Sequence, residues 1–278
     1  MRPRQWIKNS FVLGGVLYSG QALELDVLGL ALATFAAFCL ASGAAYLVND
    51  VRDEPTDRLN PRTAGRPVAR GELAPRTALA GAAVAAVLAL AVAAAINWET
   101  LATLAGFLAL QFAYSRWLKH VLFVDVMAVA GGFVLRAFAG LVAIDVRISE
   151  WLLLCTGLLA LFLGFGKRRG EAVALGGEAH PQRPVLEQYS VELIDELIAV
   201  VTPSIIVAYS LYAVLGAESQ AMMLTVPFVL YGIFRVLFLI HHRSRLPEDP
   251  TLVVWQDRPL QLCVALWALS AGAIAILA

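Results

Sequence analysis

The chain has few charged residues, and it has little of what builds disulfide-rich or metal-rich domains. Of its 278 residues, 15% are charged and 60% are hydrophobic, and only three are cysteine and four are histidine. Soluble domains carry about 25% charged residues, so this composition excludes an ordinary soluble domain. Cys39, Cys155 and Cys263 lie in separate apolar runs, which argues against a disulfide framework, and the histidines show no metal-ligand spacing.

The apolar residues gather instead in long uncharged runs. The clearest run, residues 27–48, is longer than the roughly 20 residues that a helix needs to cross a bilayer. We therefore predict an all-α, polytopic membrane protein that forms a single transmembrane domain over residues 1–278. The nine predicted transmembrane helices lie at about 10–20, 27–48, 77–97, 100–115, 121–144, 150–166, 197–217, 219–240 and 260–278.

Lysine and arginine are distributed unequally between the two sides of this topology. With nine spans and a cytoplasmic N-terminus, all but three of the 21 cations fall near the N-terminus or in loops at about 49–76, 116–120, 167–196 and 241–259. Cations accumulate in cytoplasmic loops, so the distribution predicts a multi-pass protein of the cytoplasmic membrane with these loops facing the cytoplasm. The motifs that carry chemistry lie in the same loops.

Three carboxylates follow the second apolar run. Asp50, Asp53 and Asp57 lie at i, i+3 and i+7, positions that share one face of a continuous helix. Mg²⁺ is usually held by a few carboxylates together with the phosphate oxygens of a substrate, so the spacing predicts a Mg²⁺–phosphate site. The alternative is a solvated acidic loop. Pro55 disfavours a continuous helix and leaves open whether Asp57 shares the site. Replacing Pro55 by alanine should let the helix continue, so metal affinity is expected to hold or improve.

Four arginines follow these acids within 13 residues: Arg58, Arg62, Arg66 and Arg70. The planar guanidinium group pairs with two phosphate oxygens at once. Acids and arginines in one loop therefore predict a site for several phosphate groups. The structural alternative is the ordinary excess of cations on the cytoplasmic side.

Two charged residues interrupt the fifth apolar run. Asp125 and Arg136 are separated by ~16 Å along a helix, which is too far for them to pair with each other. Ionisable residues inside a membrane usually face a cavity and mark function, although a structural link to a neighbouring helix fits equally well. In either case each residue needs another partner.

The acidic motif resembles the first signature of the UbiA-type intramembrane prenyltransferases. The resemblance rests on Asn-Asp-x-x-Asp-x-x-x-Asp at 49–57 and on Asn-Pro-Arg-Thr-Ala-Gly-Arg-Pro at 60–67. Tyr114 and Lys119 fall where that family keeps a Tyr-x-x-x-Lys element, with the lysine one position later in this chain. The family has nine transmembrane helices around a central cavity, with a Mg²⁺–diphosphate site at the cytoplasmic end, so the resemblance implies this fold and Mg²⁺ as cofactor.

Most members of the family carry a second aspartate-rich motif after the sixth span, and this chain lacks it. Lys-Arg-Arg-Gly-Glu at 167–171 stands in its place. Together with segments 2–9, 182–190 and 257–260, this resembles the branch that transfers phosphoribose to decaprenyl phosphate. The resemblance implies Mg²⁺-dependent transfer of 5-phosphoribose from phosphoribosyl diphosphate to a polyprenyl phosphate, with release of diphosphate at the cytoplasmic face.

The expected roles follow from this reaction. Asp50, Asp53 and Asp57 are the predicted Mg²⁺ ligands, and Asp50, Asp53, Lys167 and Arg168 are the predicted catalytic residues. The predicted substrate-binding residues are Lys8, Asn49, Arg58, Arg66, Tyr114, Lys119, Asp125, Arg136 and Glu171. The expected partners are phosphoribosyl diphosphate, a polyprenyl phosphate and the lipid bilayer, with no nucleic acid. The sequence allows a homo-oligomer.

Two other functions stay open at this point. The nearer one is transfer of an isoprenyl chain from an isoprenyl diphosphate to an aromatic or other acceptor by an enzyme of the same family. The more distant one is a membrane transporter without enzymatic activity, although no pattern of inverted, interrupted spans supports it.

Overall fold

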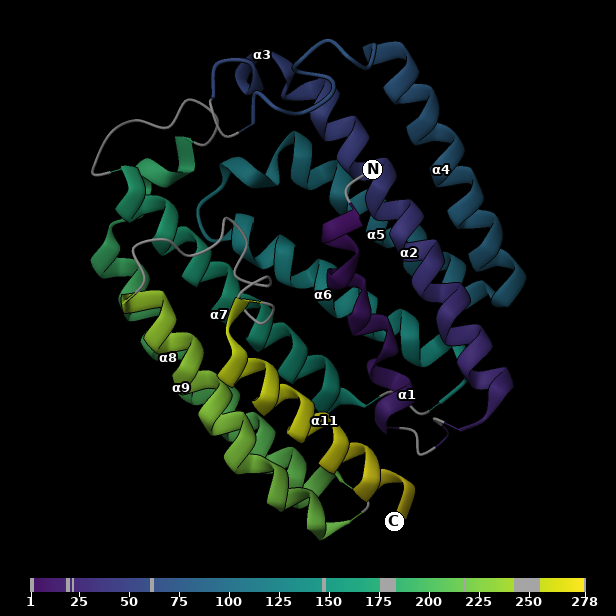
Figure 1. The fold of residues 1–278 in the computed structure, drawn as a ribbon, viewed down its shortest axis with the longest axis vertical. Helices are drawn as coiled ribbons and strands as arrows, with labels where there is room; N and C mark the ends of the chain where they lie inside the picture. Colours follow the sequence, from purple (N-terminus) through teal and green to yellow (C-terminus); the bar gives the residue numbers. More distant parts are fainter. Residues whose placement is uncertain are drawn as a thin grey trace.

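The protein is a bundle of helices in every part of the chain that the computed structural model describes, namely residues 3–18, 21, 23–60, 63–146, 149–175, 184–217, 219–242 and 256–277. No strand occurs in these ranges, so the prediction of an all-α fold is confirmed (Figure 1). The elements are η1 (Pro3–Leu13), α1 (Gly14–Tyr18), α2 (Leu25–Arg52), α3 (Glu54–Asp57), α4 (Pro75–Ile96), α5 (Trp98–Arg116), η2 (Leu118–His120), α6 (Val124–Ala143), α7 (Glu150–Leu175), η3 (Pro184–Gln188), α8 (Val191–Leu211), η4 (Tyr212–Gly216), η5 (Gln220–Thr225), α9 (Val226–His242) and α11 (Arg258–Leu277).

Seven of the described helical segments are long and apolar enough to cross a membrane. They are α2, α4, α6, α7, α8 with η4, η5 with α9, and α11. The two remaining expected spans correspond to η1 with α1, and to α5. Both are helical, but they are not among these seven. The structure thus supports a multi-pass protein, while the count of nine spans and the cytoplasmic N-terminus stay predictions.

Successive long helices alternate in direction along the bundle (Figure 1). As a result, the C-terminal ends of α2, α5, α7 and α9 share one end of the molecule with the N-terminal ends of α4, α6, α8 and α11. The loops that were predicted to be cytoplasmic therefore start and finish at the same end. Arg2, Arg62 and residues 182–183, which the sequence analysis singled out, lie outside the described residues.

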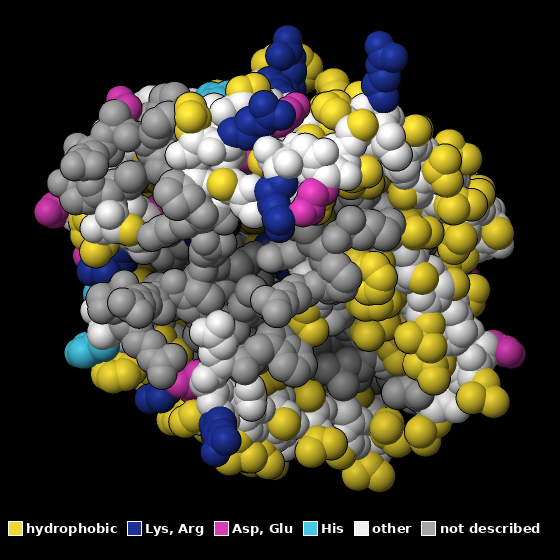
Figure 2. Space-filling model, turned by 45° about the horizontal axis from the view of Figure 1, so that its top comes forward, with side chains coloured by type: hydrophobic (Ala, Val, Ile, Leu, Met, Phe, Trp, Pro, Cys, Tyr) yellow, Lys and Arg dark blue, Asp and Glu magenta, His cyan; other side chains and the backbone are white. Residues whose placement is uncertain are grey.

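Alanine allows α2 and α4 to pack closely in the first half of the chain. Ala37 and Ala41 of α2 meet Ala89 and Ala93 of α4 in one buried cluster around Phe38, and Ala44 meets Ala82 and Ala85 in another. Small side chains let helix backbones approach each other in a membrane, where lipid removes the hydrophobic drive to associate. The other face of α4 exposes larger apolar residues, including Val84 and Val87. Figure 2 shows many hydrophobic side chains on its right side, which is the side where Figure 1 labels α4.

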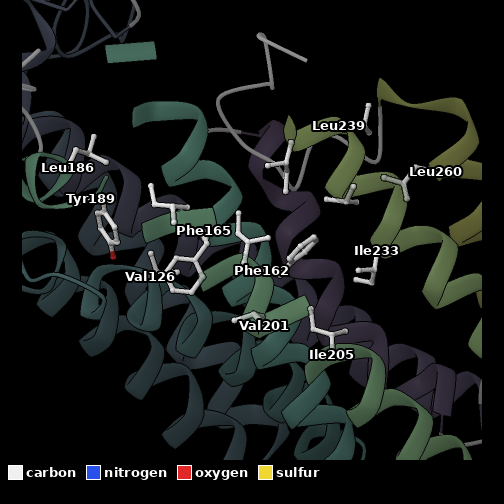
Figure 3. Packing of buried hydrophobic residues seen from close by; sticks show 14 of the residues in the cluster. Val126, Phe162, Phe165, Leu186, Tyr189, Val201, Ile205, Ile233, Leu239 and Leu260 are labelled. Atoms are coloured by element: carbon white, nitrogen blue, oxygen red, sulfur yellow. The ribbon is translucent and has the colours of Figure 1, made fainter. Parts of the chain in front are cut away.

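A larger buried cluster holds the second half together. It is formed by residues of α7, α8, α9, η3 and α11, with Val126 of α6 added from the first half, and Figure 3 shows most of these side chains. Its aromatic members are Phe162, Phe165 and Tyr189. Because Ala139 of the same helix α6 belongs to the first-half cluster, α6 is the element that joins the two cores.

The N-terminal element η1 packs into the bundle against α6. A Cβ atom added to Gly140 of α6 would overlap the carbonyl oxygen of Val12, and one added to Gly15 would lie 3.2 Å from the Gly140 backbone. Glycine at 140 is thus required for this close approach. The contact buries Asn9 completely and holds η1 beside the interior of the bundle.

Candidate active site

A cavity of about 300 Å³ lies where the two halves of the bundle meet. Its walls come from η1, α2, α5, α6 and α7, with Arg66 added from the loop after α3. The lining includes five cations and no carboxylate among the residues that the structure describes. The cations are Lys8, Arg66, Arg136, Lys167 and Arg168. Apolar residues such as Phe133 and Leu163 line the rest, so the cavity suits a ligand that is both anionic and partly apolar.

The acidic segment at one side of this cavity turns sharply, as Pro55 led us to expect. Helix α2 ends at Arg52, Asp53 adopts φ −85° and ψ 2°, and the short helix α3 restarts with Pro55 in its first turn. Proline is favourable there because the first helical N–H groups have no partner within the helix. The break redirects the chain, so that Asp57 pairs with Arg66 and is almost completely buried.

Arg66 brings two of the predicted metal ligands together. Its Nη1 atom lies 2.5 Å from Asp57 Oδ2 and 3.4 Å from Asp50 Oδ1. Asp57 thus shares a cation with Asp50, whereas its role as a metal ligand stays a prediction. Both carboxylates are buried, and Arg66 also lines the cavity.

Asp53 belongs to an adjoining polar network that joins α2 to the end of α5. Lys119 Nζ donates to Asp53 Oδ1 across 3.0 Å, and Asn49 Nδ2 donates to Asp53 Oδ2 across 2.9 Å. Ser115 Oγ in turn donates to Asn49 Oδ1 across 2.9 Å. Tyr114, Ser115 and Asn49 also line the cavity. The structure thus places the acidic motif and the predicted Tyr114 and Lys119 element side by side.

The carboxylates fit a metal ion that arrives with its substrate. No group of three or more His, Cys, Asp or Glu side chains that could hold a metal occurs within the described ranges. Two oxygens, from Asp50 and Asp57, nevertheless lie within 3.4 Å of one Arg66 nitrogen. Mg²⁺ usually binds through one or two carboxylates plus substrate phosphates, so this donor set fits such a mode and not an all-protein metal site.

A second buried network surrounds Arg168 of α7. Arg168 Nε donates to Asp125 Oδ2 across 2.6 Å, and Arg168 Nη1 donates to Glu171 Oε2 across 2.5 Å. The Tyr189 hydroxyl donates to Asp125 Oδ1 and accepts from the N–H of Phe123. Burial and the neighbouring Asp125 carboxylate raise the pKa of Tyr189, so its hydroxyl stays protonated at neutral pH. Asp125 and Glu171 therefore contact the cavity through Arg168.

Arg136 is the second buried arginine of the cavity wall. It is 5% exposed and donates from Nε to Asn9 Oδ1 across 2.7 Å and from Nη1 to the Gly132 carbonyl across 2.9 Å. Its guanidinium carbon lies 4.5 Å from the ring centre of Phe107 and 5.3 Å from that of Phe133. Asp125 and Arg136 thus have separate partners, as their spacing predicted.

Some residues of the basic motifs have partners away from the cavity. Arg58 pairs with Glu54 at the surface, and Arg169 pairs with Asp195 of α8. Asp257 pairs with Arg235 of α9 and accepts from the N–H of Leu260, so it caps α11. The structure therefore does not bring Arg58 to the cavity, although its substrate-binding role stays a prediction.

The sequence analysis missed several polar residues of the cavity wall. These are Gln5, Ser42, Tyr46, Gln111 and Ser115; Ser42 donates to Asn9 Oδ1, and the others line the cavity directly. Each is a single polar residue in or beside an apolar run, a weak signal that also fits a helix-packing position. Tyr189 was quoted as part of a motif, but only the structure shows its bond to Asp125.

Comparisons with known proteins agree with this architecture. Residues 10–256 match the model of the UbiA prenyltransferase family. A decaprenyl-phosphate phosphoribosyltransferase from Mycolicibacterium smegmatis is 30% identical, with 98% of this chain and 90% of that protein covered. One from Mycobacterium tuberculosis is 31% identical, with 98% and 92% covered.

Solved structures give the same fold. The structure of a UbiA homologue from Archaeoglobus fulgidus bound to GPP and Mg²⁺ superposes with a TM-score of 0.76 at 20% identity, covering 100% of this chain and 98% of that one. Since the family model covers most of the chain and relatives aligned over 98% of it are 30–31% identical, this protein is a transferase that belongs to the UbiA prenyltransferase family.

Proposed function

We propose that this protein transfers 5-phosphoribose from phosphoribosyl diphosphate to a polyprenyl phosphate and releases diphosphate, with Mg²⁺ as cofactor. The reaction takes place at the cavity, which opens toward the cytoplasmic face of the membrane. The proposal is supported by similarity to decaprenyl-phosphate phosphoribosyltransferases over 98% of the chain.

The observation that carries the proposal is the charge of the cavity. Five cations and no carboxylate line its described wall, and nearby carboxylates such as Asp50, Asp57 and Asp125 pair with two of these arginines. The proposed reaction brings three phosphate-containing groups together: the donor diphosphate, the donor 5-phosphate and the lipid phosphate. An isoprenyl diphosphate brings only one such group, its diphosphate. Direct contacts from lysine and arginine suit the more highly charged pair of substrates.

The residues around the acidic motif would bind the leaving group. Asp50 and Asp57, with Asp53 beside them, would hold Mg²⁺ on the donor diphosphate. When bound, Mg²⁺ neutralises charge that develops on the departing diphosphate. Arg66 can exchange its carboxylate partners for phosphate oxygens, and Asn49 and Tyr114 can donate hydrogen bonds from the cavity wall.

The transfer itself requires no strong general base. The bond from C1 of the ribose to the diphosphate oxygen breaks, and its electron pair leaves with diphosphate. An oxygen of the lipid phosphate, already ionised at neutral pH, forms the new bond to C1 from the opposite face. The product therefore has inverted configuration. Lys8, Lys167 and Arg168 line the cavity where they can neutralise the reacting phosphates.

One assay tests the proposal. Purified protein is incubated with MgCl₂, a polyprenyl phosphate and phosphoribosyl diphosphate, and the lipid product is identified by mass spectrometry. We expect a lipid-linked phosphoribose that forms only with both substrates and disappears with EDTA. Efficient transfer from geranylgeranyl diphosphate to an aromatic acceptor, without reaction of phosphoribosyl diphosphate, would overturn the proposal in favour of isoprenyl transfer.

A further inference from the structure

Arg136 differs from the other buried arginine of the cavity wall in the partners it has. Arg168 is neutralised by Asp125 and Glu171. The acceptors of Arg136 are the Asn9 side chain, the Gly132 carbonyl and, more weakly, Ser42 Oγ at 3.4 Å. All three are neutral, and no carboxylate pairs with Arg136 among the residues whose structure is described.

A buried cation without an anionic partner is unfavourable. Removing a charge from water costs more than neutral hydrogen bonds and two aromatic rings recover. The guanidinium cannot lose its proton to escape this cost. Phe107 and Phe133 make the surroundings still less polar. Arg136 is therefore suited to bind an anion that no described part of the chain supplies.

The position of Arg136 separates this anion from the group bound at the acidic motif. Ser42 contacts Arg136, and Asp50 contacts Arg66, and both lie on helix α2. Eight residues of helix separate Ser42 from Asp50, or ~12 Å along the axis. Both arginines line one cavity, so a ligand that fills it can reach both. A single diphosphate is too short to do so.

We propose that Arg136, oriented by Asn9 and Ser42, is the receptor for a phosphate monoester at the inner end of the cavity. This inference rests on the proposed function, because both substrates of that reaction carry such a group. In phosphoribosyl diphosphate it is the 5-phosphate, and in the acceptor it is the lipid phosphate. Arg136 thus binds a different group from the diphosphate that Arg66 and the carboxylates hold.

The test gives Arg136 an anionic partner from within the protein. In Asn9→Asp, a carboxylate of nearly the same shape stands 2.7 Å from Arg136 Nε and competes with the incoming phosphate. Arg136→Gln removes the cation, and Arg235→Gln is the matched control, since Arg235 pairs with Asp257 and does not line the cavity. Affinities for ribose 5-phosphate, farnesyl phosphate and Mg²⁺–diphosphate are measured by calorimetry on purified protein, together with the melting temperature.

We expect Asn9→Asp to keep or raise the melting temperature and to weaken binding of a phosphate monoester by at least about tenfold, as for loss of a charge-assisted contact. If the affinity for ribose 5-phosphate falls, Arg136 binds the 5-phosphate of the donor. If the affinity for farnesyl phosphate falls, Arg136 binds the phosphate of the lipid acceptor. Mg²⁺–diphosphate affinity should change little. If both folded variants bind both monoesters as tightly as the parent, the inference is wrong. Because binding is measured without turnover, this result is independent of whether the proposed transfer occurs.

Discussion

Arg168 and Asp125 form an ion pair in the interior of the protein, with 2.6 Å between Nε and Oδ2 and both side chains buried. The pair joins α7 to the start of α6. Glu171 occupies Nη1, and Nη2 has no protein acceptor within the described ranges. The network thus fixes the plane of a guanidinium group that lines the cavity.

Tyr189 stabilises this ion pair from the other side of Asp125. Tyr189→Phe removes the donor to Asp125 and the acceptor of the Phe123 N–H, so we expect a loss of stability of about 1–3 kcal/mol. Tyr231→Phe, at an exposed position of α9, should have no comparable effect. The free energy of unfolding in detergent measures the difference, and equal values for the two variants would contradict the role of Tyr189.

The stability that the hydrogen bond from Tyr189 to Asp125 contributes should depend on pH. The pKa of Tyr189 is raised in the folded protein, so the folded state favours the protonated hydroxyl. Its contribution to stability should be complete below the ordinary tyrosine pKa of about 10 and should be lost as the pH rises through the folded value. A melting-temperature profile that falls more steeply above pH 10 in the parent than in Tyr189→Phe would confirm this sign.

Asp50→Asn and Asp53→Asn should each lower the turnover number by at least about 100-fold, or about 2.7 kcal/mol. Each removes a charge from the predicted Mg²⁺ site while keeping the shape of the side chain. Glu54→Gln is the control, because Glu54 is next to Asp53 but pairs outward with Arg58. Turnover is measured at saturating Mg²⁺, and full activity in either aspartate variant would exclude that residue as a metal ligand.

Pro55→Ala is now expected to weaken Mg²⁺ binding, whereas the helical spacing alone led us to expect no loss. On a continuous helix Asp50 and Asp57 would be separated by ~10 Å along the axis. The break at Asp53 brings both within 3.4 Å of one Arg66 nitrogen. We expect the Mg²⁺ concentration at half-maximal activity to rise about threefold to tenfold, a cost of about 0.7–1.4 kcal/mol.

Pro75→Ala provides the matched control, since Pro75 also lies in the first turn of a helix but belongs to α4 and not to the segment that carries the carboxylates. An unchanged Mg²⁺ dependence in Pro55→Ala would mean that the turn forms without proline.

Lys167 and Arg169 offer a direct comparison of neighbouring cations. Lys167 lines the cavity, whereas Arg169 pairs with Asp195 and donates to the Ile240 carbonyl. Lys167→Ala should weaken binding of a phosphorylated substrate by ~1.5–3 kcal/mol, as expected for a charge-assisted contact. Arg169→Ala should change the melting temperature and leave that affinity unchanged. If both variants change only stability, the basic motif serves to anchor α7.

Gly140→Ala should destabilise the protein by about 1–3 kcal/mol, because its methyl group would overlap the Val12 backbone. Gly106→Ala is the control on α5, where nothing lies within 4 Å of an added Cβ atom. It should be neutral or stabilising, since alanine favours a helix over glycine by about 1 kcal/mol. Thermal unfolding of both variants decides between close packing and a general intolerance of substitution.

The uncharged runs predicted most of the helices but not all of their ends. The run at 27–48 corresponds to α2 (Leu25–Arg52), and the run at 121–144 corresponds to α6. The run at 150–166 ended at Lys167, yet α7 continues to Leu175. Tertiary contacts explain the difference. Arg168 and Arg169 pair with carboxylates on α6 and α8, so the charges do not end the helix.

The candidate site was predictable in its residue types but not in its pairing. The spacing of Asp125 and Arg136 showed that they could not meet, and the structure supplies Arg168 and Asn9 as their partners. Asn9 lies 127 residues from Arg136 in sequence, and no local pattern specifies such a contact. Likewise, the shared Arg66 contact of Asp50 and Asp57 depends on the direction of the turn at Asp53, which spacing on one helix cannot give.

The partners of α6 have a consequence for how the chain is made. Arg136 bonds to Asn9 and Ser42, which leave the ribosome before it, so its polar contacts are ready when α6 enters the bilayer. Asp125 pairs with Arg168, which follows 43 residues later. Until α7 is synthesised, α6 must therefore keep a carboxylate near the membrane surface with its principal cation still missing. Completion of the cavity is thereby delayed until the second half of the protein joins the first.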